Sequence, residues 1–364
     1  MSLFAQRRKA LLEEVNCEAY IVVDLARLMP KEIDHTSLFY LTGYTGEGVL
    51  LITKDTAVLL ADERYFESAK AALQDDMEVH QATGVYLANI KEELERLSIK
   101  ELAFTSNRIT YSLYAKLQEL TAVTLVPKDD PVSYLRRLKD ISEIEQIKKA
   151  ISLAESSLEQ LADEVRVGMT EKEIALRLEM LLMEKGAEKA FSTIAAAGKN
   201  SFNQHHHNGD TKIKEGDFLL IDFGARCNEY ICDITRTFAI KRTDEKMERQ
   251  YHTALSANKI GISNMVPGYS IREIWDTIND YFQTTEFAET GRIAGHAFGL
   301  DIHESPFMRN DNDSTLQSGI VMTMEPGIYI LGYGGVRIED DVLITENGPE
   351  VLTSFPKEEL RVIG

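Results

Sequence analysis

Two acidic residues lie inside neighbouring apolar runs of the chain. Asp222 lies in the run LLIDFG and Asp233 in the run ICDIT. A carboxylate is costly to bury among apolar side chains unless it is paired or binds a cation. The polar turn between the runs predicts an antiparallel hairpin centred between Cys227 and Asn228, with Asp222 and Asp233 opposite one another on one face. Two carboxylates so close repel each other and need a cation or a proton.

A second stretch of the chain repeats this pattern. Glu325 lies in the run VMTMEPGIYI and Glu339 in GVRIEDDVLI. The glycine-rich segment between them predicts a hairpin centred on Gly332, which again places the two acids opposite one another. Two hairpins that each present a pair of acids indicate two similar halves that face a shared site, although the sequence shows no clear repeat.

The segment GHAFGLDIHE adds two histidines, His296 and His303. Four carboxylates with one imidazole form an oxygen-rich ligand set, which favours Mn, Fe, Co or Zn over a thiolate site. Because two divalent ions balance four negative charges better than one, the spacing predicts a centre that holds two metal ions.

Each of these residues, taken singly, has an ordinary structural explanation. An acid in a strand is usually a turn residue or a hydrogen-bonded core acid, and a lone His303 is usually a satisfied histidine. A surface tract or an adventitious metal site would explain His205, His206 and His207. A solvated acidic turn would explain the run from Glu339. The agreement of two turn-centred acid pairs with a histidine favours the metal site.

The elements that position these residues follow a two-domain pattern. In the first third, apolar runs alternate with helical periodicity, which predicts a small α/β domain with a partly parallel sheet. An amphipathic helix is expected at the N-terminus and further helices over 63–73 and 109–120. The expected strands are 19–23, 48–52, 57–61, 101–105 and 123–126.

A change of pattern follows. The segment 126–140, with Pro127 and Pro131, predicts a linker, so we place an α/β domain at 1–130 and a second domain at 131–364. Helices and antiparallel strand pairs are segregated in the second domain, which indicates an α+β fold. Its strand pairs are 218–225 with 231–240 and 321–330 with 335–344. Its helices carry capping-box signals at Ser142 with Glu145, Thr170 with Glu173, and Ser270 with Glu273.

Composition excludes several classes of function. A chain of 364 residues with 44% hydrophobic content can build two cores. A net charge of -19, from 40 Lys and Arg against 59 Asp and Glu, argues against nucleic-acid binding. No run approaches the roughly 18 apolar residues of a membrane helix, and the N-terminus has no apolar signal core. Three cysteines without tight spacing predict a reducing, cytoplasmic setting.

A series of five motifs resembles a known family. In order, IDFGA, CDITRTF, GHAFGLDIHE, MEPGIYI and VRIEDD look like the metal-ligand motifs of the pita-bread metallopeptidases. That family includes methionine aminopeptidases, aminopeptidase P and Xaa-Pro dipeptidases. The resemblance covers about 135–364, and FYLTGYTGEG resembles the N-terminal domain of the proline-specific branch. It implies a C-terminal pita-bread fold with an N-terminal α/β domain of the creatinase type.

The resemblance implies a role for each motif residue. Two divalent metal ions would be bound by Asp222, Asp233, His296, Glu325 and Glu339. Mn is the preferred metal, and Co, Zn and Fe are the alternatives. Asp233 and Glu339 would bridge the ions, and Glu325 would be the general base for a bridging hydroxide. His303 and His205 would contact the substrate carbonyl and the tetrahedral intermediate. Tyr329 and Arg337 would form the supporting shell.

The sequence departs from the family pattern at two positions. The family often has a proline before the substrate histidine, but here Gln204 precedes a triple histidine. The choice among His205, His206 and His207 therefore stays open. Some aminopeptidase P enzymes have a further histidine where this chain has Arg292, so that contact is not carried over.

The resemblance implies a metal-dependent peptidase that hydrolyses the Xaa-Pro bond at the N-terminus of short peptides or in Xaa-Pro dipeptides. Its partners would be short proline-containing peptides, with no nucleic acid and no membrane; since relatives commonly dimerise, a homodimer is possible. Aminopeptidase and dipeptidase activities both stay open. The alternatives are a non-catalytic pita-bread binding module, a methionine-aminopeptidase-like enzyme and creatinase-like hydrolysis of a small amide. The intact ligand positions and the N-terminal domain disfavour all three.

Overall fold

A computed structural model describes the whole chain except residues 1, 26–33, 74–76, 84–85 and 121. The chain divides into two compact units, Met1–Arg136 and Arg137–Gly364. In the described residues we find no helix with the length and apolar character needed to cross a bilayer.

The N-terminal unit is built on one six-stranded mixed sheet with the order β4-β3-β2-β1-β5-β6. The pairs β3–β4, β1–β5 and β5–β6 are parallel, which confirms the predicted partly parallel sheet. Its elements are α1 (Leu3–Val15), β1 (Ala19–Asp24), α2 (His35–Thr42), β2 (Gly48–Thr53), β3 (Ala57–Asp62), α3 (Phe66–Ala72), β4 (Glu78–Ala82), α4 (Tyr86–Arg96), β5 (Glu101–Thr105), α5 (Tyr111–Leu120), β6 (Thr124–Lys128) and α6 (Pro131–Arg136).

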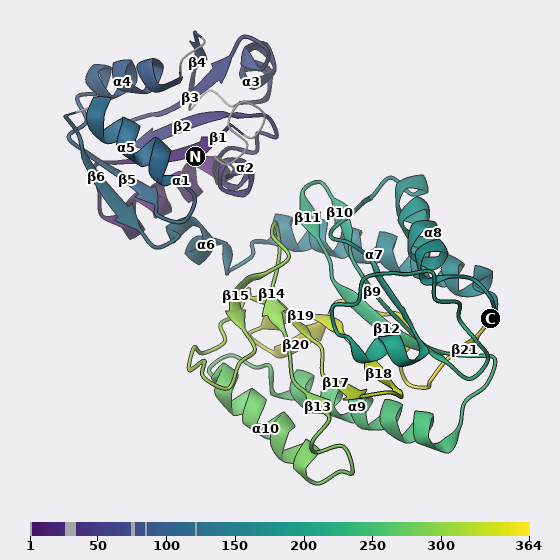
Figure 1. Ribbon diagram of the computed structural model, residues 1–364. Helices are drawn as coiled ribbons and strands as arrows, with labels where there is room; N and C mark the ends of the chain where they lie inside the picture. Colours follow the sequence, from purple (N-terminus) through teal and green to yellow (C-terminus); the bar gives the residue numbers. More distant parts are fainter. Residues whose placement is uncertain (1, 26–33, 74–76, 84–85, 121) are drawn as a thin grey trace. The chain divides into compact units, whose positions relative to one another are not determined.

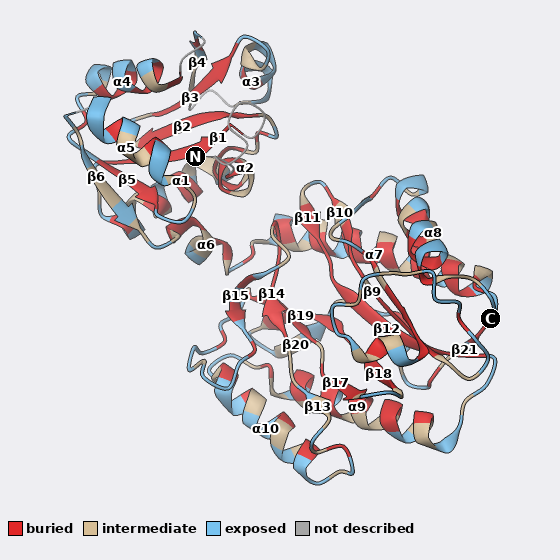
Figure 2. Cartoon of the chain, in the orientation of Figure 1, coloured by how far each residue is buried: buried red, intermediate tan, exposed pale blue. Residues whose placement is uncertain are grey.

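The central strands of this sheet are buried on both faces, as their continuous apolar runs require (Figure 2). Ile21 and Leu51 on one face join a core with Ile90 of α4 and Leu117 of α5. Helices α1 and α2 contact strands β2 and β1.

The expected linker over 126–140 is wrong for much of its length. Strand β6 continues to Lys128, and Pro127 pairs with Phe104 of β5. Because β6 is an edge strand, the missing N–H of Pro127 interrupts no inner ladder. Pro131 is the first residue of helix α6, a position that proline favours.

The C-terminal unit combines four helices with four small sheets in its described residues (Figure 1). Its elements are α7 (Ile141–Glu164), α8 (Glu171–Glu184), β7 (Glu188–Lys189), β8 (Ile194–Ala197), a 3-10 helix (Gly198–Phe202), β9 (Phe218–Phe223), β10 (Ala225–Cys227), β11 (Tyr230–Ile231), β12 (Ile234–Ile240), α9 (Glu245–Asn264), α10 (Ile271–Gln283), β13 (Gly291–Arg292), β14 (His296–Ala297), β15 (Glu304–Phe307), β16 (Val321–Met324), β17 (Gly327–Ile330), β18 (Gly334–Arg337), β19 (Asp340–Thr345), β20 (Gly348–Val351) and β21 (Val362–Ile363).

Two helix pairs, α7 with α8 and α9 with α10, are built alike. The second helix of each pair begins with a capping box, and both boxes are confirmed, at Thr170 with Glu173 and at Ser270 with Glu273. Thr170 and Ser270 each also form an isolated antiparallel bridge to a later segment of the chain. The unit is therefore made of two similar halves, as the two acid-bearing hairpins predicted.

The capping box predicted for the long helix is displaced by two residues. Asp140 caps α7 and forms the box with Glu143, in place of Ser142 with Glu145. Asp is as good an N-cap as Ser, and its carboxylate accepts from the backbone N–H of Glu143 at 3.1 Å.

Candidate metal centre

The predicted strands of this unit break at acidic residues. Asp233 lies between β11 and β12, Glu325 between β16 and β17, and Glu339 between β18 and β19. Asp222 is the exception and lies inside β9. At a break the side chain is free of the strict alternation of a strand, so it can turn towards a common point.

The second hairpin has the predicted register. Met324 pairs with Asp340 on one side of the break and Gly327 with Arg337 on the other. Both ladders place Glu325 opposite Glu339, which confirms that prediction.

The first hairpin has a different register from the one predicted. Asp222 pairs with Thr235, not with Asp233, because the turn is centred on Asn228 and Glu229. Both turn residues have a left-handed backbone, with φ of 49° and 71°. The displacement is two residues, and a shift of two keeps a side chain on the same face. Asp222 and Asp233 accordingly line the same cavity.

The five predicted ligands meet at one cavity of about 560 Å³ in the C-terminal unit. Ligand atoms of Asp233, His296 and Glu339 all lie within 4.8 Å of one another. His296 Nε2 is 3.5 Å from Asp233 Oδ2 and also 3.5 Å from Glu325 Oε1. Asp222 and Glu325 complete the acidic lining.

Simultaneous ionisation of the acids in this cluster is unfavourable without a cation. Burial, followed by the charges of Glu339, Asp222 and Glu325, raises the pKa of Asp233 well above the usual carboxyl value. Burial, followed by the charges of Glu325 and Asp222, raises the pKa of Glu339. Burial also raises the pKa of Glu325, although Arg337 opposes this shift. A divalent cation removes this repulsion.

A cation also fits the hydrogen bonding. Among the described residues, Asp233 Oδ1 is buried without any donor. An orphaned buried oxygen in a cluster of carboxylates with an imidazole is the donor set of a hard or borderline divalent ion.

Arg337 lies against the acidic cluster and fixes its orientation. Its guanidinium forms an ion pair with Asp222 and donates to the Tyr329 hydroxyl at 2.8 Å. Its Nε donates at 3.0 Å to Thr235 Oγ1, which in turn donates at 2.6 Å to Glu339. The structure thus brings Tyr329 and Arg337 to the site, and it adds Thr235, which sequence reasoning missed.

Two further histidines line the same cavity, His303 and His205. The His303 ring is edge-on to His296, with centroids 4.4 Å apart. Burial and the neighbouring His296 lower the pKa of His303, which favours the neutral imidazole. His206 points elsewhere, since its Nε2 lies 2.8 Å from Glu171.

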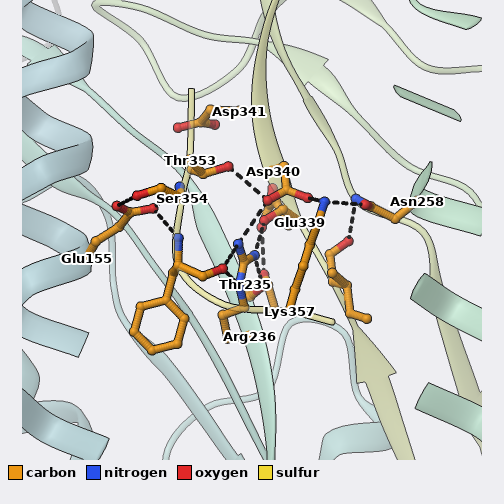
Figure 3. A network of polar contacts seen from close by, with 12 residues as sticks. Glu155, Thr235, Arg236, Asn258, Glu339, Asp340, Asp341, Thr353, Ser354 and Lys357 are labelled. Atoms are coloured by element: carbon orange, nitrogen blue, oxygen red, sulfur yellow. Dashed lines mark hydrogen bonds and ion pairs between the residues drawn. The ribbon is translucent and has the colours of Figure 1, made fainter. Parts of the chain in front are cut away.

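A second polar network lies behind the ligands (Figure 3). Arg236 Nη2 lies 2.9 Å from Asp340 Oδ1, and Lys357 contacts the other oxygen of the same carboxylate. Arg236 also donates to the carbonyl of Glu339. Asp340 and Asp341 are fully buried, so the solvated acidic turn is wrong for this run. The sequence carried a signal for this network. Arg236 lies in the apolar run before Phe238, and a buried cation needs a buried acid as its partner.

Comparison with known families decides where the chain belongs. Residues 145–346 match the sequence model of Metallopeptidase family M24, and residues 5–138 match that of the Creatinase/Prolidase N-terminal domain. The chain belongs to metallopeptidase family M24. Membership of the M24 family implies divalent metal ions, in agreement with the ligand set.

Relatives within the M24 family match nearly the whole chain. Similarity to an Xaa-Pro dipeptidase of Pyrococcus furiosus is 35% identity over 330 residues, 88% of this chain and 92% of the relative. An Xaa-Pro dipeptidase structure from Bacillus anthracis matches with a TM-score of 0.92 at 32% identity, covering 99% and 100% of the two chains. An X-Pro aminopeptidase structure from Thermotoga maritima matches with a TM-score of 0.90, also at 32%, covering 96% and 98%. The expected fold and the proline-specific branch of the family are confirmed.

Proposed function

We propose that the chain is a two-metal peptidase that hydrolyses the Xaa-Pro bond of short peptides, either at the N-terminus or in dipeptides. One observation carries the proposal: a single cavity is lined by Asp222, Asp233, His296, Glu325 and Glu339. The names of the M24 relatives, dipeptidase and aminopeptidase alike, support the Xaa-Pro specificity.

The five residues would hold two divalent ions, with Mn as the first choice and Co, Zn or Fe as alternatives. Asp233 and Glu339 would bridge the ions. Asp222 would complete the ligands of one ion, and His296 with Glu325 would complete those of the other. The donor-free oxygen of Asp233 supports its bridging role. Bound there, the ions would lower the pKa of a water and polarise the scissile carbonyl.

Glu325 would act as general base and then as general acid. Burial raises the pKa of this carboxyl, which brings it closer to neutral pH and suits it to hold a proton transiently. The proline nitrogen leaves as a secondary amine and must gain a proton to do so. Glu325 would accept the proton from water and deliver it to that nitrogen.

His303 and His205 would stabilise the charge that develops on the carbonyl oxygen. Both line the cavity from outside the ligand set. A neutral imidazole carries one N–H, and the lowered pKa of His303 favours that form. A positioned N–H donor of this kind strengthens its bond as the oxygen gains charge.

The cavity suits a short peptide that contains proline. Its volume is in the range of small-molecule sites. Apolar side chains that a prolyl ring can contact line part of the wall, among them Phe191, Ile194, Phe307 and Met308. An Xaa-Pro bond has no N–H, so a site that acts on the carbonyl loses no hydrogen bond there.

The proposal includes a cytoplasmic, homodimeric enzyme. Cys17, Cys227 and Cys232 are all free thiols, as expected in a reducing compartment. Cell fractionation and light scattering of the purified protein test these two points separately.

Product analysis tests the activity. The Mn-loaded protein is incubated with Ala-Pro, with Ala-Pro-Ala-Ala, with a Met-Gly peptide and with Ala-Ala as the matched control, and the products are identified by mass spectrometry. Cleavage of Ala-Pro alone identifies a dipeptidase, and release of Ala from the tetrapeptide identifies an aminopeptidase. If both Xaa-Pro peptides stay intact while a Met-Gly peptide is cleaved, the proposal is wrong and the methionine-aminopeptidase alternative holds. Intact peptides throughout, with no bound metal, favour the binding module.

A further inference from the structure

Glu171 is a buried acid that the proposed mechanism does not use. It is the first residue of α8, and its side chain is 0% exposed. In the other half of the unit the first residue of α10 is Ile271, which is equally buried. The fold therefore accepts an apolar side chain at this position. Formation of the helix does not require the carboxylate of Glu171, so its role is to be found in its contacts outside the helix.

The contacts of Glu171 supply that reason. Its Oε1 accepts from Ala197 N and from Asn200 Nδ2, both at 2.9 Å. Its Oε2 accepts from Gly209 N at 2.9 Å and faces His206 Nε2 at 2.8 Å. All four donors belong to the segment 197–209, which carries His205 between them.

This hydrogen bonding favours the ionised form of Glu171. Burial opposes ionisation of Glu171, but the bonds from His206, Ala197, Asn200 and Gly209 outweigh it and hold its pKa below the usual value. An ionised carboxylate with four donors is a strong and directional anchor.

A second anchor holds the same segment from the sheet side. Asn208 Oδ1 accepts from Ala195 N at 2.8 Å, and its Nδ2 donates to Thr193 O at 2.7 Å. Strand β8 in turn pairs with β9 so that Ile194 lies opposite Asp222. The residues that follow His205 are thus tied to the strand that bears a metal-ligand candidate.

The geometry points to Glu171 and His206 as positioning residues that set where His205 lies in the metal cavity. Of the three consecutive histidines, His205 faces the cavity, and His206 is the side chain by which the loop is fastened to α8. This inference rests on the proposed function, because it takes His205 to act on the substrate.

Single variants of the Mn-loaded enzyme test the inference on an Xaa-Pro peptide. His206→Ala removes the fastening, and we expect kcat to fall by about 10- to 100-fold with bound Mn and thermal stability nearly unchanged. His206→Gln places an amide nitrogen where Nε2 was, and we expect it to retain most of the turnover. His207→Ala is the matched control, since the exposed His207 neighbours the same residues and should leave kcat unchanged.

A double-mutant cycle separates positioning from a merely structural role. If His206 acts through His205, then His206→Ala has no further effect on kcat in a His205→Ala background. Additive losses, or a full-activity His206→Ala enzyme beside an impaired His205→Ala enzyme, overturn the inference and leave the proposed function intact. An unimpaired His205→Ala enzyme removes the premise instead, and with it the role given to His205 in the proposed function.

Discussion

Thr235 Oγ1 donates a hydrogen bond of 2.6 Å to Glu339 Oε2. The hydroxyl also accepts from Arg337 Nε, so it relays the orientation of the guanidinium to the carboxylate. Thr235→Val keeps the shape of the side chain and removes the hydroxyl. We expect metal affinity to fall about 10- to 100-fold, the usual effect of losing an outer partner of a ligand. Metal titration by calorimetry measures the affinity. Thr235→Ser is the control, because it keeps the hydroxyl donor. Equal metal affinities of the Val and Ser variants would contradict the prediction.

Asp233→Asn tests the proposed bridging ligand. The amide removes one negative charge from between the two ions, so we expect loss of most bound metal and most activity with the fold retained. Because Asp233 is repelled by its neighbours, the metal-free variant should also be no less stable than metal-free wild type. Elemental analysis, turnover and thermal unfolding report on these points. Full turnover in this variant excludes the bridging role.

His303→Ala separates substrate chemistry from metal binding. His303 lies beside His296 but is not in the ligand set, so bound metal should be unchanged. Turnover should fall by about 100-fold, the effect of removing one donor to developing charge. Steady-state kinetics with parallel metal analysis provide the measurement. Unchanged kcat would remove His303 from the mechanism.

The acidic cluster predicts a pH-dependent stabilisation by metal. Burial and repulsion raise the pKa values of Asp233 and Glu339, so the folded state holds protons that the unfolded state has already released. Stability of the metal-free protein is therefore lost as pH rises through the raised folded pKa values. A bound cation cancels this loss, so the gain in Tm on adding Mn should grow from about pH 5 to about pH 7.5. A gain in Tm that stays constant over this range rules out the coupling.

Asp340→Asn tests the network behind the ligands. The change leaves the buried Arg236 and the partly exposed Lys357 without their shared counter-charge (Figure 3). Breaking such a pair from one side costs roughly 3 kcal/mol of folding stability. Urea unfolding of the metal-free protein measures this cost. Glu159→Gln is a suitable control, because its pair with Arg361 is largely exposed and should matter little.

Much of the fold could be predicted from local pattern. The apolar runs of the first third become β1, β2, β3 and β5 with ends within one residue of the expected ones. The capping boxes predicted at Thr170 and Ser270 are confirmed, because a capping box depends only on two residues three positions apart. Helices α2 and α4 were not predicted. The predicted linker was wrong at Pro127, because a proline is tolerated in an edge strand and local pattern does not show that β6 is at the edge.

The sequence by itself determined that Asp222, Asp233, Glu325 and Glu339 gather at one site and that Glu325 faces Glu339. Glycines mark the turn between Glu325 and Glu339, and strand pairing follows from a turn. The sequence did not determine the register of the first hairpin, because Asn228 and Glu229 adopt a left-handed turn that their residue types do not demand. Only the tertiary structure decided the partners of the ligands. Thr235 reaches Glu339, and Glu171 reaches His206, across long stretches of chain, and no local pattern encodes a contact whose two sides are brought together by packing alone.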